Sequence, residues 1–266
     1  MGNGDPFSVL CIAGSDPTGG AGVQGDLKTF AAHGAYGMAV VAALTAQNHR
    51  GVSRVLPVPA EFVVACLEAA LDQASPAATK TGMLLTPEVA DAVGACLTAR
   101  PEGRRHLVVD PVLRATAGGT LAATGLVDAL RRAVFPLAEL VTPNLDEGAV
   151  LLGRPIAPGD ERDAAAALWR LLAGPAVLLK GGHARGAPTD HLATAAGVAA
   201  FTLPRLDVRD GHGAGCALSA SIAVRLGRGE PLAAAVAGAK AYVHRALAAA
   251  RPLGCGRGPV RHDVPA

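Results

Sequence analysis

The sequence predicts a single doubly wound α/β domain whose mostly parallel sheet is covered by helices on both faces. Short apolar runs alternate with longer segments in which apolar residues recur at helical spacing. The short runs are apolar throughout, as is typical of parallel strands that are buried on both faces. Half of the 266 residues are hydrophobic, so a single domain spanning residues 1–266 can form a large core without disulfides or a structural metal.

The first two thirds of the chain supply the alternating pattern. Apolar runs predict strands at residues 8–12, 38–44, 106–110, 139–142 and 176–180. The intervening segments predict helices at residues 24–33, 60–74, 87–99, 121–134 and 161–172.

The last third of the chain departs from this alternation. Residues 190–194 and 198–203 favour a hairpin at the edge of the sheet, around a turn that contains glycine. Two apolar segments, 217–226 and 231–250, are typical of helices. Residues 251–266 are rich in Gly, Pro and Arg and are predicted to form a surface tail.

Composition narrows the class of partner. A net charge of +2, with 17% charged residues, lacks the basic field of a nucleic-acid-binding protein. The apolar runs are too short to span a bilayer, so no membrane association is expected. Five scattered cysteines, with no C-x-x-C pair, are typical of the reducing cytoplasm. The expected partner is a small molecule.

A glycine-rich loop runs directly into the helix predicted at residues 217–226. Gly213 and Gly215 let backbone N–H groups turn toward a common point, and the helix that begins near Cys216 directs its unpaired amides to the same point. Such a loop binds anions, and phosphate is the expected guest. A glycine-rich turn that merely enters a helix is the alternative.

A second glycine motif resembles the dinucleotide-binding fingerprint but does not complete it. Residues 20–25 match G-x-G-x-x-G after a strand and before a helix. That fingerprint needs an acidic residue about twenty positions later, and no acid occurs between Asp26 and Glu61. A Walker A motif is also absent from the sequence. Nucleotide phosphates would therefore be bound by a different structural motif.

Nine motifs occur in an order and spacing that resemble one family. They are residues 13–22 (AGSDPTGGAG), 26–30 (DLKTF), 34–37 (GAYG), 45–48 (TAQN), 80–84 (KTGML), 109–112 (VDPV), 142–147 (TPNLDE), 180–183 (KGGH) and 212–216 (HGAGC). Together they resemble the ribokinase-like superfamily, and within it the hydroxymethylpyrimidine and phosphomethylpyrimidine kinases of thiamin biosynthesis. The resemblance extends from about residue 9 to residue 262 and implies a ribokinase-like fold, ATP and Mg²⁺ as cofactors, and a homodimer.

The resemblance implies roles on the phosphate side of the site. Phosphoryl transfer needs a phosphate cradle, a metal site, a nearby cation and a means of removing the acceptor proton. The catalytic residues implied for the cradle, which stabilises the transferring group through backbone amides, are Gly213, Ala214, Gly215 and Cys216.

Asn144 and Glu147 match the family's N-x-x-E motif. The motif implies that Asn144 binds ATP and that the Glu147 carboxylate helps hold hydrated Mg²⁺. The same spacing also fits a helix capping box, which is the alternative reading of this pair.

Three more residues belong to the same side of the site. Lys180 is implied to contact the ATP phosphates, although a lysine that closes a strand commonly extends to solvent. Asp110 is implied to order the metal, or else caps the following turn. Cys216 is implied to be the catalytic base, with a pKa lowered by the helix N-terminus below the free value of about 8.5. The alternatives for Cys216 are a small buried thiol or a nucleophile with His212 as its base.

The acceptor pocket implied by the resemblance combines polar and apolar side chains. An aminopyrimidine needs hydrogen-bonding groups in its plane and an apolar side chain against its face, for which Gln47 and Met83 are suitable. Either could instead be an ordinary loop amide or core residue. The implied substrate-binding set is Gly14, Asp26, Thr45, Gln47 and Met83.

Two departures from the family pattern bear on activity and specificity. Ala214 and Ala217 replace threonines, which removes two hydroxyls and leads us to expect weaker catalysis. Residues 113–119 lack the cysteine of relatives that also phosphorylate pyridoxal. We therefore expect an ATP-dependent kinase of 4-amino-5-hydroxymethyl-2-methylpyrimidine and its monophosphate. A vitamin B6 kinase and a catalytically weakened pyrimidine-binding relative are the alternatives.

Overall fold

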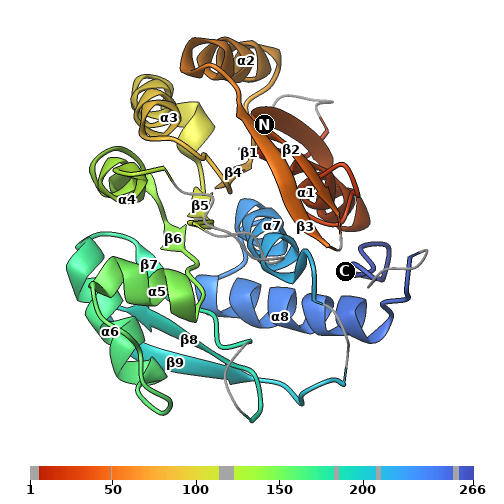
Figure 1. Ribbon diagram of the computed structural model, residues 1–266, viewed down its shortest axis with the longest axis vertical. Coiled ribbons are helices and arrows are strands. Elements are labelled where there is room, and N and C mark those ends of the chain that lie inside the picture. The colour runs from red at the N-terminus through yellow and green to blue at the C-terminus, as the bar shows by residue number, and fades with distance from the viewer. Residues whose placement is uncertain (1–5, 49, 114–122, 183–185, 208–210, 254–257) are drawn as a thin grey trace.

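The computed structural model describes residues 6–48, 50–113, 123–182, 186–207, 211–253 and 258–266. Within these residues nine strands form one sheet, in the order β3-β2-β1-β4-β5-β6-β7-β8-β9 (Figure 1). The six strands from β2 to β7 pair in parallel. Antiparallel strands extend both edges, with β3 on one side and the β8–β9 hairpin on the other. The predicted fold class and the edge hairpin are confirmed.

Two of the strands were not predicted. The strands are β1 (Ser8–Gly14), β2 (Tyr36–Asn48), β3 (Gly51–Pro57), β4 (Ala78–Thr81), β5 (Val108–Val109), β6 (Leu140–Val141), β7 (Ala176–Leu179), β8 (Thr189–Thr194) and β9 (Gly197–Thr202). β3 is a largely exposed edge strand without an apolar run. β4 is fully buried, yet three of its four residues are polar, so its sequence gives no apolar signal. The pattern of apolar residues therefore does not predict either strand.

The helices agree with the predicted segments except between residues 121 and 134, and the helix at Leu145–Leu152 was not among those predicted. They are α1 (Gly22–Ala32), α2 (Ala60–Gln73), α3 (Pro87–Ala99), α4 (Leu126–Ala129), α5 (Leu145–Leu152), α6 (Glu161–Leu172), α7 (Ala214–Gly227) and α8 (Leu232–Ala248). α4 begins only after Gly125, whose φ of +85° ends the preceding turn, and it continues as a π-helical turn, Leu130–Val134. Residues 121–122 of the predicted helix lie outside the described residues. No helix of the described chain is long and apolar enough to cross a membrane.

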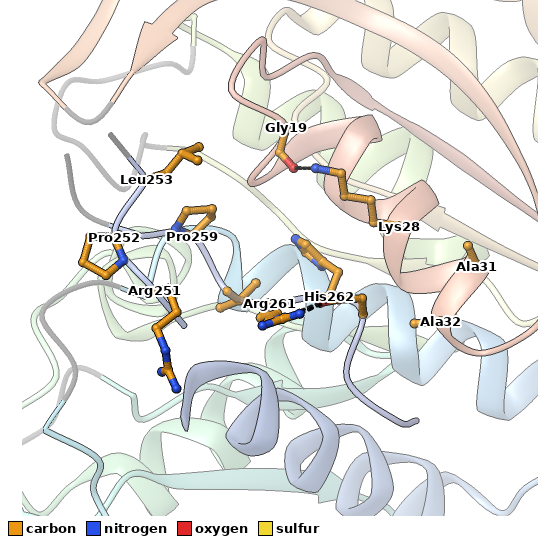
Figure 2. A pocket seen from close by; sticks show the side chains of 12 residues that line it. Gly19, Lys28, Ala31, Ala32, Arg251, Pro252, Leu253, Pro259, Arg261 and His262 are labelled. Atoms are coloured by element: carbon orange, nitrogen blue, oxygen red, sulfur yellow. Dashed lines mark hydrogen bonds and ion pairs between the residues drawn. The ribbon is translucent and has the colours of Figure 1, made fainter. Parts of the chain in front are cut away.

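The prediction of a surface tail at residues 251–266 is wrong for its second half. Val260 and His262 are 2% and 6% exposed. Val260 joins the core cluster beneath α1, α7 and α8, and the Tyr242 hydroxyl of α8 donates to the His262 carbonyl at 2.8 Å. Figure 2 shows this segment opposite α1, where the two line a surface pocket. Glycine and proline gave this segment the composition of a loop, but Val260 and Val264 pack against the core.

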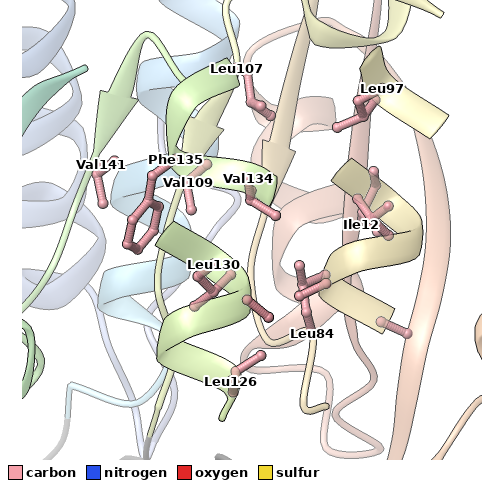
Figure 3. Close-up of a cluster of buried hydrophobic side chains, with 14 of the residues drawn as sticks. Ile12, Leu84, Leu97, Leu107, Val109, Leu126, Leu130, Val134, Phe135 and Val141 are labelled. Carbon is pink, nitrogen blue, oxygen red and sulfur yellow. The ribbon is translucent and has the colours of Figure 1, made fainter. Parts of the chain in front are cut away.

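The sheet separates two core layers. On β1, Leu10 and Ile12 point into a cluster covered by α2, α3, α4, α5 and α6, part of which Figure 3 shows. Val9, Cys11 and Ala13 point into the opposite cluster, covered by α1, α7 and α8. Because successive side chains of a strand point to opposite faces, a strand that is apolar throughout contributes to both layers.

The winding direction of the sheet changes between β1 and β4. From β1 the chain crosses to β2 on one side and later returns to β4 on the other. In open α/β sheets, ligands bind outside the carboxyl ends of the strands at such a switch point. Gly14 ends β1 and Gly82 follows β4, so the fold places both at the expected binding crevice.

Candidate active site

The anion loop (residues 212–216) has the geometry predicted for it. Gly213 precedes α7 with a φ of +87°, and the helix begins at Ala214. A Cβ at residue 213 would lie 1.8 Å from the Gly20 carbonyl oxygen, so only glycine fits this contact. The first-turn amides of α7 consequently open at the carboxyl edge of the sheet, close to the turn after β1. Residues 208–210, which precede the loop, lie outside the described residues.

Lys180 and Asp110 form an ion pair beside the anion loop. Lys180 follows β7, and its Nζ lies 2.6 Å from Asp110 Oδ1. A Cβ at Gly215 would lie 3.4 Å from that same Nζ. The Lys180 side chain is only 12% exposed, so it does not extend into solvent. Burial lowers the pKa of Lys180, but the carboxylates of Asp110 and Glu147 raise it by a larger amount. The net shift of the pKa is therefore upward. The ammonium group therefore stays charged next to the anion loop.

Asp110 is held in place by two hydroxyls as well as by the lysine. Thr142 Oγ1 donates to Asp110 Oδ1 at 3.2 Å, and Ser219 Oγ donates to Oδ2 at 3.4 Å. The Asp110 side chain is 2% exposed. Thr142 follows β6 and Ser219 lies in α7, so the carboxylate joins the sheet edge to the helix that carries the anion loop.

Asn144 and Glu147 form the capping box that was the alternative reading of their spacing. Asn144 Oδ1 accepts from the Glu147 amide and Glu147 Oε2 accepts from the Asn144 amide, both at 2.8 Å. Burial raises the pKa of the Glu147 carboxyl to about 7, with Lys180 opposing the shift and Asp110 adding to it. Glu147 thus caps α5 and also places a second carboxyl in the electrostatic neighbourhood of Asp110 and Lys180.

The prediction of a lowered pKa for Cys216 is wrong. The thiol is partly buried, and burial raises its pKa to about 11. The Lys80 ammonium and the backbone amide of Gly22 lower the pKa, whereas Asp26 and Asp110 raise it. Desolvation therefore outweighs the helix N-terminus, which was the only influence that the sequence revealed.

His212, the alternative base for Cys216, is partnered by a residue that sequence reasoning missed. His212 Nε2 lies 2.8 Å from Asp16 Oδ2. The Asp16 carboxylate also accepts from the amides of Thr18 and Ala21, each at 2.9 Å. Burial raises the pKa of Asp16, but the bonds to His212 and Thr18 prevail and hold it at about 2. The signal in the sequence was an aspartate within a glycine-rich turn.

The predicted acceptor residues gather at the ends of β1 and β2. A Cβ at Gly14 would lie 2.2 Å from Met83 Cε, so the methionine packs directly on the glycine. Thr45 Oγ1 donates to the Ser15 carbonyl at 2.8 Å. Gln47, two residues further along β2, is partly exposed. These positions fit an apolar ring face against Met83 with polar groups nearby.

Asp26 was predicted to bind the substrate, but the structure places it in a buried ion pair. It is fully buried, and both of its carboxylate oxygens accept from Lys80 Nζ, at 3.0 and 2.8 Å. Burial raises the pKa of Asp26 to about 6, against the effect of Lys80. Lys80 was not predicted as a functional residue, although a lysine on a fully buried strand was an available signal.

The two alanines that replace threonines differ in their settings. Ala214 is partly exposed at the start of α7, whereas Ala217 is fully buried in the core. A threonine hydroxyl at residue 217 would therefore lie among buried side chains, whereas one at residue 214 would be partly exposed. His183 and residues 114–119 lie outside the described residues.

The switch point of the sheet, the anion loop at a helix N-terminus and the adjacent lysine define a ribokinase-like phosphotransferase. Solved structures agree with this class. Bacillus subtilis pyridoxal kinase superposes with a TM-score of 0.86 and 29% identity, covering 97% of this chain and 98% of that one. A phosphomethylpyrimidine kinase from Clostridium difficile superposes with a TM-score of 0.77 and 34% identity, covering 90% of this chain and 99% of that one.

A family model described as phosphomethylpyrimidine kinase matches residues 16–261, and the chain belongs to this family. The hydroxymethylpyrimidine/phosphomethylpyrimidine kinase of Rhizobium meliloti is 46% identical over 259 residues, which cover 96% of each chain. The protein of the same name from Escherichia coli is 40% identical over 261 residues. The bifunctional thiamine biosynthesis protein ThiED of Geobacter sulfurreducens is also 46% identical, and this chain spans 53% of its length.

Proposed function

We propose that this chain transfers the γ-phosphoryl group of ATP to the hydroxymethyl oxygen of 4-amino-5-hydroxymethyl-2-methylpyrimidine, and then phosphorylates the monophosphate. The observation that carries the proposal is the anion loop at the start of α7 with the Lys180 ammonium beside it. Membership of the phosphomethylpyrimidine kinase family supports the choice of acceptor and a role in thiamin biosynthesis.

The anion loop and Lys180 stabilise the charge that develops on the transferring group. In this proposal the backbone amides at the α7 N-terminus donate to phosphate oxygens. The predicted contribution of Ala214 needs correction, because its amide already donates to the Gly211 carbonyl at 2.9 Å. Lys180 is positioned by Asp110, so its charge needs little reorganisation when transfer begins. This division of work suits phosphoryl transfer, in which positioning and charge neutralisation supply most of the catalysis.

Cys216 accepts the proton of the hydroxymethyl group in this proposal. With a pKa of about 11, the Cys216 thiol is mostly neutral near pH 7. The thiolate fraction rises tenfold with each pH unit below that pKa, so base catalysis by Cys216 makes the rate strongly dependent on pH. The Gly22 amide and the Lys80 ammonium are the groups that favour the thiolate.

Acceptor recognition is assigned to Gly14, Thr45, Gln47 and Met83. Met83 offers a polarizable apolar surface, and Gln47 offers both a donor and an acceptor for an aminopyrimidine. Asp26 acts through its ion pair with Lys80, because its carboxylate is fully buried.

Mg²⁺ belongs to the proposal as a hydrated ion held mainly by phosphate oxygens. The described residues contain no cluster of three or more metal-binding side chains. Asp110 and Glu147 are two carboxyls in one neighbourhood, a number that suits Mg²⁺ bound with nucleotide phosphates. The raised pKa of Glu147 marks a carboxyl that a cation would stabilise in its charged form. A homodimer and a cytoplasmic location complete the proposal.

A vitamin B6 kinase is the second candidate, because a pyridoxal kinase superposes over nearly the whole chain. One experiment separates the candidates: ATP consumption with the pyrimidine alcohol, its monophosphate or pyridoxal as acceptor, at matched concentrations. The proposal predicts the highest kcat/KM with the two pyrimidines. A higher kcat/KM with pyridoxal would favour the B6 kinase, and binding of all three without turnover would favour a pyrimidine-binding relative.

A further inference from the structure

Two loops from distant parts of the sequence meet at the site and fix each other's position. The glycine loop (residues 16–22) follows β1, and the anion loop precedes α7. His212 Nε2 lies 2.8 Å from Asp16 Oδ2 across the junction. Gly213 approaches Gly20 so closely that a Cβ at residue 213 would lie 1.8 Å from the Gly20 oxygen. A displacement of either loop would therefore be transmitted to the other.

A third segment, residues 258–263, bonds to both loops. The Val260 amide donates to the His212 carbonyl at 3.1 Å. His262 Nε2 lies 3.2 Å from the Gly20 carbonyl oxygen. Pro259 also packs on Gly20, since a Cβ at residue 20 would lie 2.8 Å from Pro259 Cβ. Gly20 is thus enclosed between the anion loop and the 258–263 segment.

His262 is itself held from two helices, at its ring and at its backbone carbonyl. Its Nδ1 lies 3.1 Å from Thr29 Oγ1 of α1, and its backbone carbonyl accepts from the Tyr242 hydroxyl of α8. A carbonyl oxygen can only accept, so Nε2 is the donor in the bond to Gly20. Figure 2 shows His262 on the wall of the pocket that it shares with Gly19 and Lys28. The imidazole therefore connects the helical layer to the glycine loop.

The surroundings of His262 favour the neutral imidazole, and a neutral ring can still donate to the Gly20 carbonyl. Burial lowers the pKa of His262, the bond to Gly20 and the Asp263 carboxylate raise it, and Lys28 and His212 lower it. The net shift is downward. A neutral imidazole protonated on Nε2 fulfils the donor role, so the bond does not require a charged ring.

We propose that His262 is a positioning residue for phosphoryl transfer, which holds the Gly20 peptide so that the glycine loop keeps the anion loop in its catalytic position. The inference rests on the proposed function. From Gly20 the chain runs two residues to Gly22, whose backbone amide lowers the pKa of the Cys216 thiol. His262 thereby acts on both the phosphate cradle and the proposed base, through Gly20 and without touching either substrate.

The test compares a donor-free and a donor-bearing substitution. His262→Leu removes the bond to Gly20 and is expected to lower kcat about tenfold, on the scale of one hydrogen bond lost in the transition state. His262→Gln retains an N–H at a similar reach and is expected to stay within about threefold of the unsubstituted protein. Rescue by glutamine distinguishes positioning from simple filling of the core.

His33→Leu is the matched control. His33 is also a buried histidine of the same layer, with its Nε2 2.9 Å from Ser221 Oγ and its ring against Tyr242. It bonds to the middle of α7 instead of to the glycine loop, so its loss is expected to lower the melting temperature but leave kcat within about twofold. Equal losses of kcat in His262→Leu and His33→Leu would overturn the proposal.

If His262→Leu does not fold, Thr29→Val releases Nδ1 while leaving the imidazole in place; a kcat lowered about threefold supports the proposal, and an unchanged kcat overturns it. If the unsubstituted protein phosphorylates none of the acceptors, the proposed function fails separately. ATP affinity then provides the measurement: His262→Leu should bind ATP at least about threefold more weakly than His33→Leu, and equal affinity overturns the positioning role.

Discussion

Replacing Gly213 by alanine should disable the site through one steric contact. The added Cβ would lie 1.8 Å from the Gly20 carbonyl oxygen, whereas such contacts in real structures are not closer than 3.0 Å. The two loops must therefore separate by about 1.2 Å, from 1.8 to 3.0 Å. A misplacement of about 1 Å at an active site can cost about a hundredfold in rate, so we expect kcat of Gly213→Ala to fall by that factor.

Gly229→Ala supplies the control for backbone strain alone. Gly229 has a φ of +84°, nearly that of Gly213, but no atom lies within 4 Å of its added Cβ. Both substitutions bear the cost of a left-handed alanine, about 1 to 2 kcal/mol, and only Gly213→Ala also forces the loops apart. Steady-state kinetics and thermal unfolding of both variants provide the assay. Near-normal kcat in Gly213→Ala, or an equal loss in Gly229→Ala, would refute this reasoning.

Three further substitutions test individual roles. Lys180→Ala should lower kcat at least about a hundredfold and also lower the melting temperature, since Asp110 is left buried without its partner; a change in stability alone would leave Lys180 a structural residue. Because the raised pKa of Cys216 keeps the thiol protonated, kcat/KM should rise with pH between about 7 and 9. Cys216→Ser should lose most turnover and this dependence on pH while still binding ATP. A flat pH profile in the unsubstituted protein would remove Cys216 as the base. Ala214→Thr should raise kcat roughly tenfold by adding a donor at the partly exposed start of α7; an unchanged or slower folded variant would mean that the loop is adapted to alanine.

The sequence predicted the parts of the fold that depend on local pattern. The all-apolar run of β1 and the helical spacing of α3 and α6 carry their own signals, and the structure has them where expected. β4 carries no such signal, because Lys80 on this buried strand is neutralised by Asp26, 54 positions away in the sequence. Pairings between distant residues decide such elements, and a single sequence does not reveal them.

The same limit applies to the site. Gly213, Gly215 and Lys180 were predicted to lie near one another, and the structure brings them together. The direction of the Cys216 pKa shift was wrong, because desolvation depends on how tightly other elements surround the thiol. The contact of His262 with Gly20 spans 242 positions and was likewise hidden.

The most direct measurement follows the γ-phosphoryl group itself. ATP labelled in its γ-phosphate is incubated with the protein and the pyrimidine alcohol, and the products are separated and weighed by mass spectrometry. Transfer by Lys180 and the anion loop predicts label on the hydroxymethyl oxygen in proportion to the ADP formed, and almost none with Lys180→Ala. Label recovered as free phosphate or bound to Cys216, with the pyrimidine unchanged, would contradict it.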